Sequence, residues 1–242
     1  MEWRLIIDRA ADAALNMARD EAILAGVRGG GPVTLRFYAW RPPAFSLGYF
    51  QAYGEFAAHA ARGVPVVRRL TGGGAIYHAQ EVTYSLCGPF GAGSFPRRAS
   101  AIFQKVHTAI GGGLRELGIA AALSDAPSGR SPSICFSRPQ KFDIVVGGRK
   151  LLGSAQCRRG GFFLQHGSLP LAPNPFAPEA VSIAELVAKQ PAEATIVETL
   201  AAALSVAFGA RLRKAPLGEG EEEMAAGLAA ERYSRDSWNA RR

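Results

Sequence analysis

The sequence has few cysteines, a modest share of charged residues and no long apolar run. Its three cysteines are unevenly scattered over 242 residues, which excludes a disulfide framework and favours a reducing, cytoplasmic location. No stretch approaches the roughly 20 apolar residues that span a bilayer. The opening segment, Met1 to Asp8, is too short and too acidic for a signal peptide. We therefore expect a cytoplasmic protein without membrane association.

Signatures for metal and nucleic-acid binding are also missing. The cysteines and histidines show no paired ligand spacing, so no metal site is expected. There is no zinc-finger spacing and no RNP-type aromatic motif. Lys and Arg number 28 against 20 Asp and Glu, a formal net charge of +8. This excess suits a nucleic acid, an anionic lipid or an acidic protein partner, or simply a solubilising surface, and the charge alone does not choose among them. Without a recognition motif we expect no nucleic-acid partner.

What is present is the composition of an ordinary globular protein. Hydrophobic residues make up 48% and charged residues 20% of the chain, which excludes disorder. We expect one domain over residues 1–242, because no linker or repeat divides it. Alternating patterns predict strands at 3–8, 33–38, 45–49, 64–69, 81–86, 142–146, 149–155 and 162–165. Apolar spacing and alanine-rich runs predict helices after residue 8, at 56–62, from 98 to 117, at 196–208 and at 219–233.

The order of these elements predicts the fold class. Hairpin-like strand pairs outnumber strand–helix–strand units, so we expect an α+β fold with a largely antiparallel sheet. Gly147 and Gly148 favour a tight two-residue turn between two of the strands. Gly111 to Gly113 weaken the predicted long helix, because glycine in a helix costs up to about 1 kcal/mol relative to alanine.

A glycine-rich stretch follows one predicted strand. Residues 68–78 read Arg-Arg-Leu-Thr-Gly-Gly-Gly-Ala-Ile-Tyr-His. The amides of Gly72, Gly73 and Gly74 could point at an anion or a carbonyl group. Arg69 could add a charge-assisted hydrogen bond. A Walker A ending is absent, and the glycines alone fit a flexible surface loop equally well.

Two further stretches hold candidate residues. Lys150 follows the Gly147–Gly148 turn and precedes Gly153, Ser154 and Ala155, whose small side chains would leave room for a ligand beside the lysine. Later, His166 and Gly167 stand together at a predicted strand end. Taken singly, such a lysine is usually a solvated cation and such a histidine is usually structural.

Together, the three stretches resemble the biotin/lipoyl protein ligase superfamily, and within it the lipoate–protein ligase A type. The resemblance rests on Arg-Arg-x-Thr-Gly-Gly-Gly-Ala-x-x-His, Gly-Arg-Lys-x-x-Gly-Ser-Ala-Gln and Gln-His-Gly-Ser-Leu in this order, and it covers about residues 3–238. It implies a single mixed domain with an acyl tunnel beside the glycine loop, and Lys150 as the functional lysine. The implied substrate-binding residues are Arg69, Gly72, Gly73, Gly74, His78, Gly153, Ser154, Ala155, His166 and Gly167.

That superfamily contains ATP-dependent ligases and cysteine-dependent octanoyltransferases. Ser133-Ile134-Cys135-Phe136 is similar to the transferase segment whose cysteine is the nucleophile. Residues 80–85 and 233–239 are also similar to the transferases, and the chain leaves no room for the accessory domain of ligases. Ala79 departs from the acidic residue usual after the histidine, which puts a local hydrogen bond in doubt.

The resemblance thus implies an octanoyltransferase with Cys135 and Lys150 as catalytic residues and no cofactor. The octanoyl group would move from acyl carrier protein to a lysine of a lipoyl domain, on a glycine-cleavage H protein or a dehydrogenase E2 subunit. One alternative is an ATP-dependent lipoate ligase, which would use ATP and Mg²⁺. Another is a non-catalytic acyl- or carrier-binding protein. We expect Cys87 to be a buried small hydrophobe and Cys157 to be partly exposed without a role.

Overall fold

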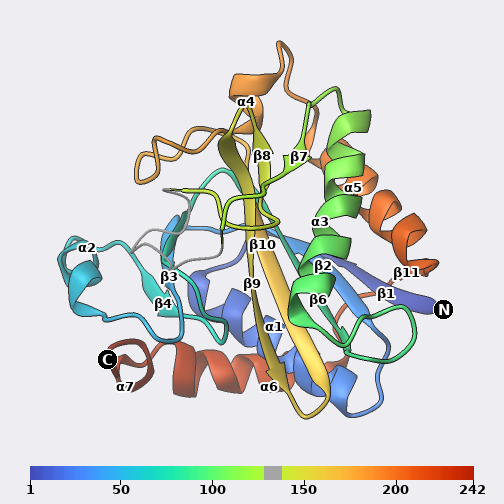
Figure 1. Ribbon diagram of the computed structural model, residues 1–242. Coiled ribbons are helices and arrows are strands. Elements are labelled where there is room, and N and C mark those ends of the chain that lie inside the picture. Colours follow the sequence, from blue (N-terminus) through green and yellow to red (C-terminus); the bar gives the residue numbers. More distant parts are fainter. Residues whose placement is uncertain (128–137) are drawn as a thin grey trace.

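The computed structural model describes residues 1–127 and 138–242, and a large mixed sheet forms its centre (Figure 1). Its strands are β1 (Glu2–Ile7), β2 (Thr34–Tyr38), β6 (Glu81–Pro89), β7 (Ala122–Leu123), β8 (Ile144–Val146), β9 (Arg149–Arg159), β10 (Phe162–Pro170) and β11 (Arg211–Lys214). They lie in the order β11-β1-β2-β6-β10-β9-β8-β7. Only β1 pairs in parallel, with β2 and β11, so the prediction of a largely antiparallel α+β fold is confirmed.

A small second sheet lies beside the large one. It contains β3 (Ala44–Leu47), β4 (Val66–Arg68) and β5 (Ile76–His78), in the order β4-β3-β5. The glycine-rich segment joins β4 to β5, so it is a loop, as predicted. The predicted tight turn also forms between β8 and β9, because Gly147 and Gly148 adopt the positive φ angles of +57° and +79° that a two-residue hairpin requires.

Helices cover both faces of the large sheet. They are α1 (Ala13–Arg28), α2 (Ala57–Ala61), α3 (Ala99–Glu116), α4 (Ile183–Leu186), α5 (Glu193–Phe208), α6 (Glu219–Leu228) and α7 (Asp236–Asn239), with short turns η1 (Gly54–Phe56) and η3 (Ala229–Tyr233). α3 and α5 lie side by side, to the right of the long strands in Figure 1, and bury the largest apolar core. α1 and α6 pack together on the opposite face.

The predicted helix from 98 to 117 is confirmed as α3, which continues through Gly111–Gly113. A close neighbour explains one of these glycines, because a Cβ at Gly113 would lie 3.2 Å from Ala203 Cβ on α5. Two expectations need correction. The predicted helix at 219–233 divides into α6 and the π-type turn η3. The strands β5, β7 and β11 were not predicted. They are short, and β11 is a basic segment that becomes a strand by pairing with β1.

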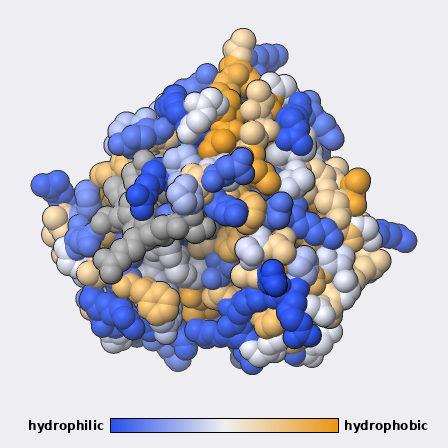
Figure 2. Space-filling view, in the orientation of Figure 1, coloured by the Kyte–Doolittle hydropathy of each residue, from blue (hydrophilic) through white to orange (hydrophobic). Residues whose placement is uncertain are grey.

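Hydrophilic side chains dominate the face seen in Figure 2, with an apolar strip near α4 and the upper end of β8. Within residues 1–127 and 138–242, no helix combines the length and apolar character needed to cross a membrane.

Candidate functional site

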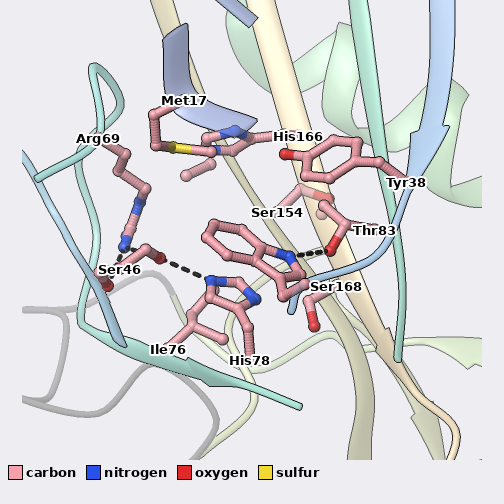
Figure 3. Close-up of a pocket in the computed structure, with 13 residues that line it drawn as sticks. Met17, Tyr38, Ser46, Arg69, Ile76, His78, Thr83, Ser154, His166 and Ser168 are labelled. Carbon is pink, nitrogen blue, oxygen red and sulfur yellow. Dashed lines mark hydrogen bonds between the residues drawn. The ribbon is translucent and has the colours of Figure 1, made fainter. Parts of the chain in front are cut away.

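A pocket lies between the two sheets and against α1 (Figure 3). In this view His166 and His78 stand on opposite sides of the pocket, and Arg69 and Ser46 close a third side. The lining residues are Met17, Tyr38, Trp40, Ser46, Arg69, Ile76, His78, Thr83, Ser154, Ala155, His166, Gly167 and Ser168.

The structure brings many of the sequence-predicted residues together here. Of the predicted substrate-binding residues, those in the lining are Arg69, His78, Ser154, Ala155, His166 and Gly167. The three loop glycines, Gly153 and Lys150 are outside the lining. Gly72 and Gly74 are bonded to Arg69. Gly153 and Lys150 lie on β9, the strand that carries Ser154 and Ala155 of the lining. Cys135 lies outside the described residues.

A buried relay of hydrogen bonds passes through His166. Asp20 on α1 accepts a bond from Nδ1 of His166 at 3.2 Å, and Nε2 of His166 is 2.7 Å from Thr71 Oγ1. Thr71 Oγ1 also accepts from Arg69 Nε at 3.0 Å. Because an ionised carboxylate only accepts, the hydrogen of the neutral His166 ring lies on Nδ1, toward Asp20, and Nε2 accepts from the Thr71 hydroxyl.

A second relay of the same design passes through His78. Glu81 Oε1 is 2.7 Å from Nδ1 of His78, and Nε2 of His78 is 2.7 Å from Ser46 Oγ. Ser46 Oγ accepts from Arg69 at 3.2 Å. Each relay therefore runs from Arg69 through a hydroxyl and a histidine to a carboxylate. Glu81 supplies the acidic partner that Ala79 cannot, which answers the doubt raised by that position.

Arg69 forms hydrogen bonds to the backbone of the glycine loop. Its Nη2 donates to the carbonyl oxygens of Gly72 and Gly74 at 2.6 and 2.7 Å. Since Arg69 is only 1% exposed, these charge-assisted bonds fix the loop firmly against the pocket wall. A direct contact of Arg69 or the loop amides with a ligand stays a prediction.

Although many lining residues are polar, their polar atoms are bonded within the wall. The Tyr38 hydroxyl donates to Asp20 at 3.0 Å, Trp40 Nε1 donates to Thr83 at 2.8 Å, and Ser168 donates to Glu81 at 2.6 Å. Trp40 also stacks on the His78 ring at 3.8 Å between centroids. The wall thus exposes ring faces and carbon atoms to a bound ligand, which suits an apolar chain.

Burial and the relays set the ionisation of these groups. Burial alone would raise the pKa of Asp20, but hydrogen bonds from His166 and the charge of Arg36 bring that pKa below its usual value. The pKa of Glu81 is likewise lowered, because its bonds to His78, Ser168 and Thr83 outweigh burial. Burial lowers the pKa of His166. The site therefore combines ionised carboxylates with a neutral His166.

Lys150 is a buried cation on β9, four residues before Ser154 of the pocket lining. It is 2% exposed, and its Nζ lies 2.7 Å from Asp143 Oδ2. A Cβ at Gly153 would lie 2.3 Å from Lys150 Cε and 2.5 Å from Nζ. The expectation that Gly153 leaves room for a ligand beside the lysine needs correction here, because the lysine's own side chain fills that space.

Several polar residues of the site were missed from the sequence. His107 on α3 donates through Nδ1 to the Phe142 carbonyl oxygen at 2.6 Å and accepts through Nε2 from Ser154 at 2.7 Å. The spacing of Phe103, His107 and Ile110 could have revealed it, since a histidine there lies on the apolar face of a helix. Asp20 had no comparable signal.

The structure also describes two of the three cysteines. Cys87 is fully buried, as predicted, and burial raises the pKa of its thiol well above the ordinary value. Cys157 is partly buried, which raises its pKa to about 11. In residues 1–127 and 138–242, no group of three acidic, cysteine or histidine side chains could hold a metal ion.

Comparison with known proteins agrees with this fold. A model of the lipoyl protein ligase A/B catalytic domain matches residues 12–203, and the chain belongs to this family. Over an alignment of 272 positions it is 37% identical to the octanoyltransferase LipM of Kyrpidia tusciae, covering 99% of both chains. Over another alignment of 272 positions it is 37% identical to the octanoyltransferase LipM of Symbiobacterium thermophilum, covering 99% of this chain and 98% of the relative. Among solved structures, a lipoate–protein ligase A bound with ATP matches with a TM-score of 0.84 and 26% identity, covering 99% of each chain.

Proposed function

We propose that this chain is an octanoyltransferase that moves an octanoyl group from acyl carrier protein to a lysine of a lipoyl domain. The observation that carries the proposal is the 37% identity to octanoyltransferases along 99% of the chain. The pocket supports it, because walls whose polar atoms are already bonded to one another accept an alkyl chain without leaving buried groups unpaired.

The proposed reaction has two acyl transfers and consumes no ATP. The Cys135 thiolate attacks the carrier's thioester, forms a new thioester and releases the carrier thiol. The acceptor lysine, as the free amine, then attacks the enzyme thioester. An amide forms, the Cys135 thiolate leaves, and the amine's extra proton goes to solvent or to a base. The raised pKa values of Cys87 and Cys157 make these two sulfurs poor nucleophiles at neutral pH.

Lys150 is the proposed electrostatic catalyst. Its buried ammonium would favour the Cys135 thiolate and stabilise the oxyanion that forms when a thioester carbonyl is attacked. Asp143 fixes the ammonium at 2.7 Å, so the charge is held in place before the reaction. Gly72–Gly74, His78, His166 and the 153–155 run would shape the acyl tunnel.

The donor and acceptor classes follow from the proposed reaction. We propose octanoyl acyl carrier protein as donor, lipoyl domains of glycine-cleavage H protein or dehydrogenase E2 subunits as acceptors, and the cytoplasm as location. Both partners are typically acidic, and the net charge of +8 would steer their approach.

An ATP-free transfer assay tests the function. Purified protein is mixed with octanoyl carrier protein and an unmodified lipoyl domain, and the acceptor's mass is followed. We expect octanoylation without ATP and none with Cys135→Ala. Turnover only with free acid, ATP and Mg²⁺ would instead identify a ligase. Binding of the octanoyl carrier without any turnover would identify a non-catalytic carrier-binding protein.

A further inference from the structure

His107 is a buried histidine whose two ring nitrogens both have partners. It is 1% exposed and lies on α3, outside the pocket lining. A carbonyl oxygen only accepts, so the 2.6 Å contact with the Phe142 carbonyl places the hydrogen on Nδ1. Nε2 then accepts from the Ser154 hydroxyl. Burial lowers the pKa of His107 by more than the bond to the Phe142 carbonyl and the charge of Asp143 raise it, which favours the neutral ring.

The residue held by Nδ1 has an unusual backbone. Phe142 has φ = +69°, the only positive φ of a non-glycine residue in the described part of the chain. Such a conformation costs about 1–3 kcal/mol and persists only where neighbours enforce it. Two bonds do so: the Phe142 amide donates to Ser124 O at 2.9 Å, and its carbonyl accepts from His107.

This strained residue directs the next side chain. Asp143 Oδ2 accepts from the amide of Gln140 at 2.8 Å and from Lys150 Nζ at 2.7 Å. The position of the Lys150 ammonium therefore depends on Asp143, and the position of Asp143 depends on the turn at Phe142.

Polar groups of the sheet orient the His107 ring from its other side. Ser154, which donates to Nε2, is 2.7 Å from the Tyr84 hydroxyl, and Tyr84 accepts from Gln165 Nε2 at 2.8 Å. With its proton given to His107, Ser154 accepts from Tyr84. Each hydrogen bond has one direction, so the ring is held with Nδ1 toward Phe142.

We propose that His107 is a positioning residue for Lys150, acting through the Phe142 carbonyl and Asp143. The inference rests on the proposed role of Lys150 in acyl transfer. The hydrogen-bond partners of the His107 ring among the described residues are Phe142 and Ser154, and neither is a proposed reacting group. Its Nδ1–H keeps the turn that presents the Asp143 carboxylate, and this carboxylate holds the ammonium where the oxyanion forms.

Two substitutions separate the two ring contacts. The side-chain amide nitrogen of asparagine can occupy the place of Nδ1, whereas the amide oxygen of glutamine can reach the place of Nε2 and accept from Ser154. His107→Asn therefore keeps a donor for Phe142, and His107→Gln keeps a partner for Ser154 but leaves the Phe142 carbonyl unpaired. A misplacement of about 1 Å can cost about 10²-fold in rate. We expect His107→Gln to slow acylation of Cys135 by about 10- to 100-fold in kcat with little change in KM, and His107→Asn to stay within about threefold of wild type.

A second measurement does not depend on activity. Acetic anhydride labels exposed amines, and peptide mass spectrometry reports the modification of Lys150. The ion-paired lysine should be protected in wild type and in His107→Asn, and labelled faster in His107→Gln. Unfolding temperatures of both variants are measured in parallel.

The outcomes are distinct. If His107→Gln acylates at the wild-type rate and protects Lys150, the inference is wrong. Equal losses in both variants, in proportion to their loss of stability, would show a purely structural role and also overturn it. If wild type transfers no octanoyl group, the proposed function fails, while the labelling of Lys150 still tests the positioning by His107.

Discussion

The replacement Gly153→Ala tests whether the place of the Lys150 ammonium matters, without removing its charge. The new methyl group would lie 2.3 Å from Lys150 Cε and 2.5 Å from Nζ, against the 3.4 Å at which ordinary contact begins. The end of the Lys150 side chain must therefore move away by about 1 Å, which is the difference between the 2.3 Å separation and ordinary contact at 3.4 Å. Because the displaced atoms are the end of a flexible side chain, the cost to stability should be small, about 1 kcal/mol.

The effect on rate should be much larger than the effect on stability. Loss of one well-placed oxyanion donor typically costs about 10²–10³ in rate, so acylation of Cys135 should slow by about 10²-fold, or about 2.7 kcal/mol in activation free energy. The unfolding temperature should fall by only about 2–4 °C, as expected for 1 kcal/mol in a chain of this length.

The assay is single-turnover acylation by octanoyl carrier protein, followed by intact mass, with thermal unfolding measured on the same samples. Gly112→Ala is the matched control. A Cβ there meets nothing closer than 3.9 Å, and alanine in the helix interior should stabilise the protein by up to about 1 kcal/mol with an unchanged rate. If folded Gly153→Ala acylates as fast as wild type, the ammonium's position has no part in catalysis.

Four further outcomes are expected. Cys135→Ala should form no octanoyl adduct by intact mass, whereas Cys87→Ala and Cys157→Ala should retain it; an adduct on the first variant would show that the wrong sulfur was chosen. Lys150→Ala should slow single-turnover acylation by about 10²–10³-fold and raise the pH at which Cys135 is alkylated. Lys150→Arg should rescue little of this rate, because the planar guanidinium has another shape than the ammonium. A wild-type rate for Lys150→Ala would show that Lys150 has no part in the mechanism. The apparent second-order rate constant should fall as salt shortens the Debye length from about 30 Å at 0.01 M to about 8 Å at 0.15 M; a salt-independent constant would return the net charge of +8 to a role in solubility. Burial lowers the pKa of His166 in the folded state. Its contribution to stability is therefore complete above the unfolded pKa of about 6.5 and is lost as pH falls through the folded value. Urea unfolding at pH 7.5, 6.5 and 5.5 should show this decline, and a constant free energy of unfolding would refute it.

Local sequence signals predicted most elements because local geometry produces them. Gly147 and Gly148 were expected at the β8–β9 turn, where the backbone requires two positive φ angles. The spacing of Val106, Ile110 and Leu114 predicted α3, and these three residues are buried. Helix propensity did not explain the glycine at 113, because it does not show that α5 passes close enough to favour a small residue.

The candidate site was found in part for the same reason. Two of the three short motifs pointed to Arg69, His78 and His166, which line the pocket. Their partners came from elsewhere: Asp20 is 146 residues from His166 in the chain, and no periodicity connects the two. Arg69 also joins the two histidine networks, because it donates to both the Thr71 and the Ser46 hydroxyl groups.

The sequence by itself determined the fold class, the glycine loop, the tight turn and the identity of Lys150 as a candidate, because backbone preference and motif order are properties of neighbouring residues. Only the tertiary structure decided that Gly153 accommodates the lysine's own side chain, and that His107, through the Phe142 carbonyl, supports the turn that carries Asp143. The physical reason is that contact and burial depend on which elements pack together. A helix and a hairpin distant in sequence meet at Phe142 and Ser154, and their packing gives the lysine its fixed place.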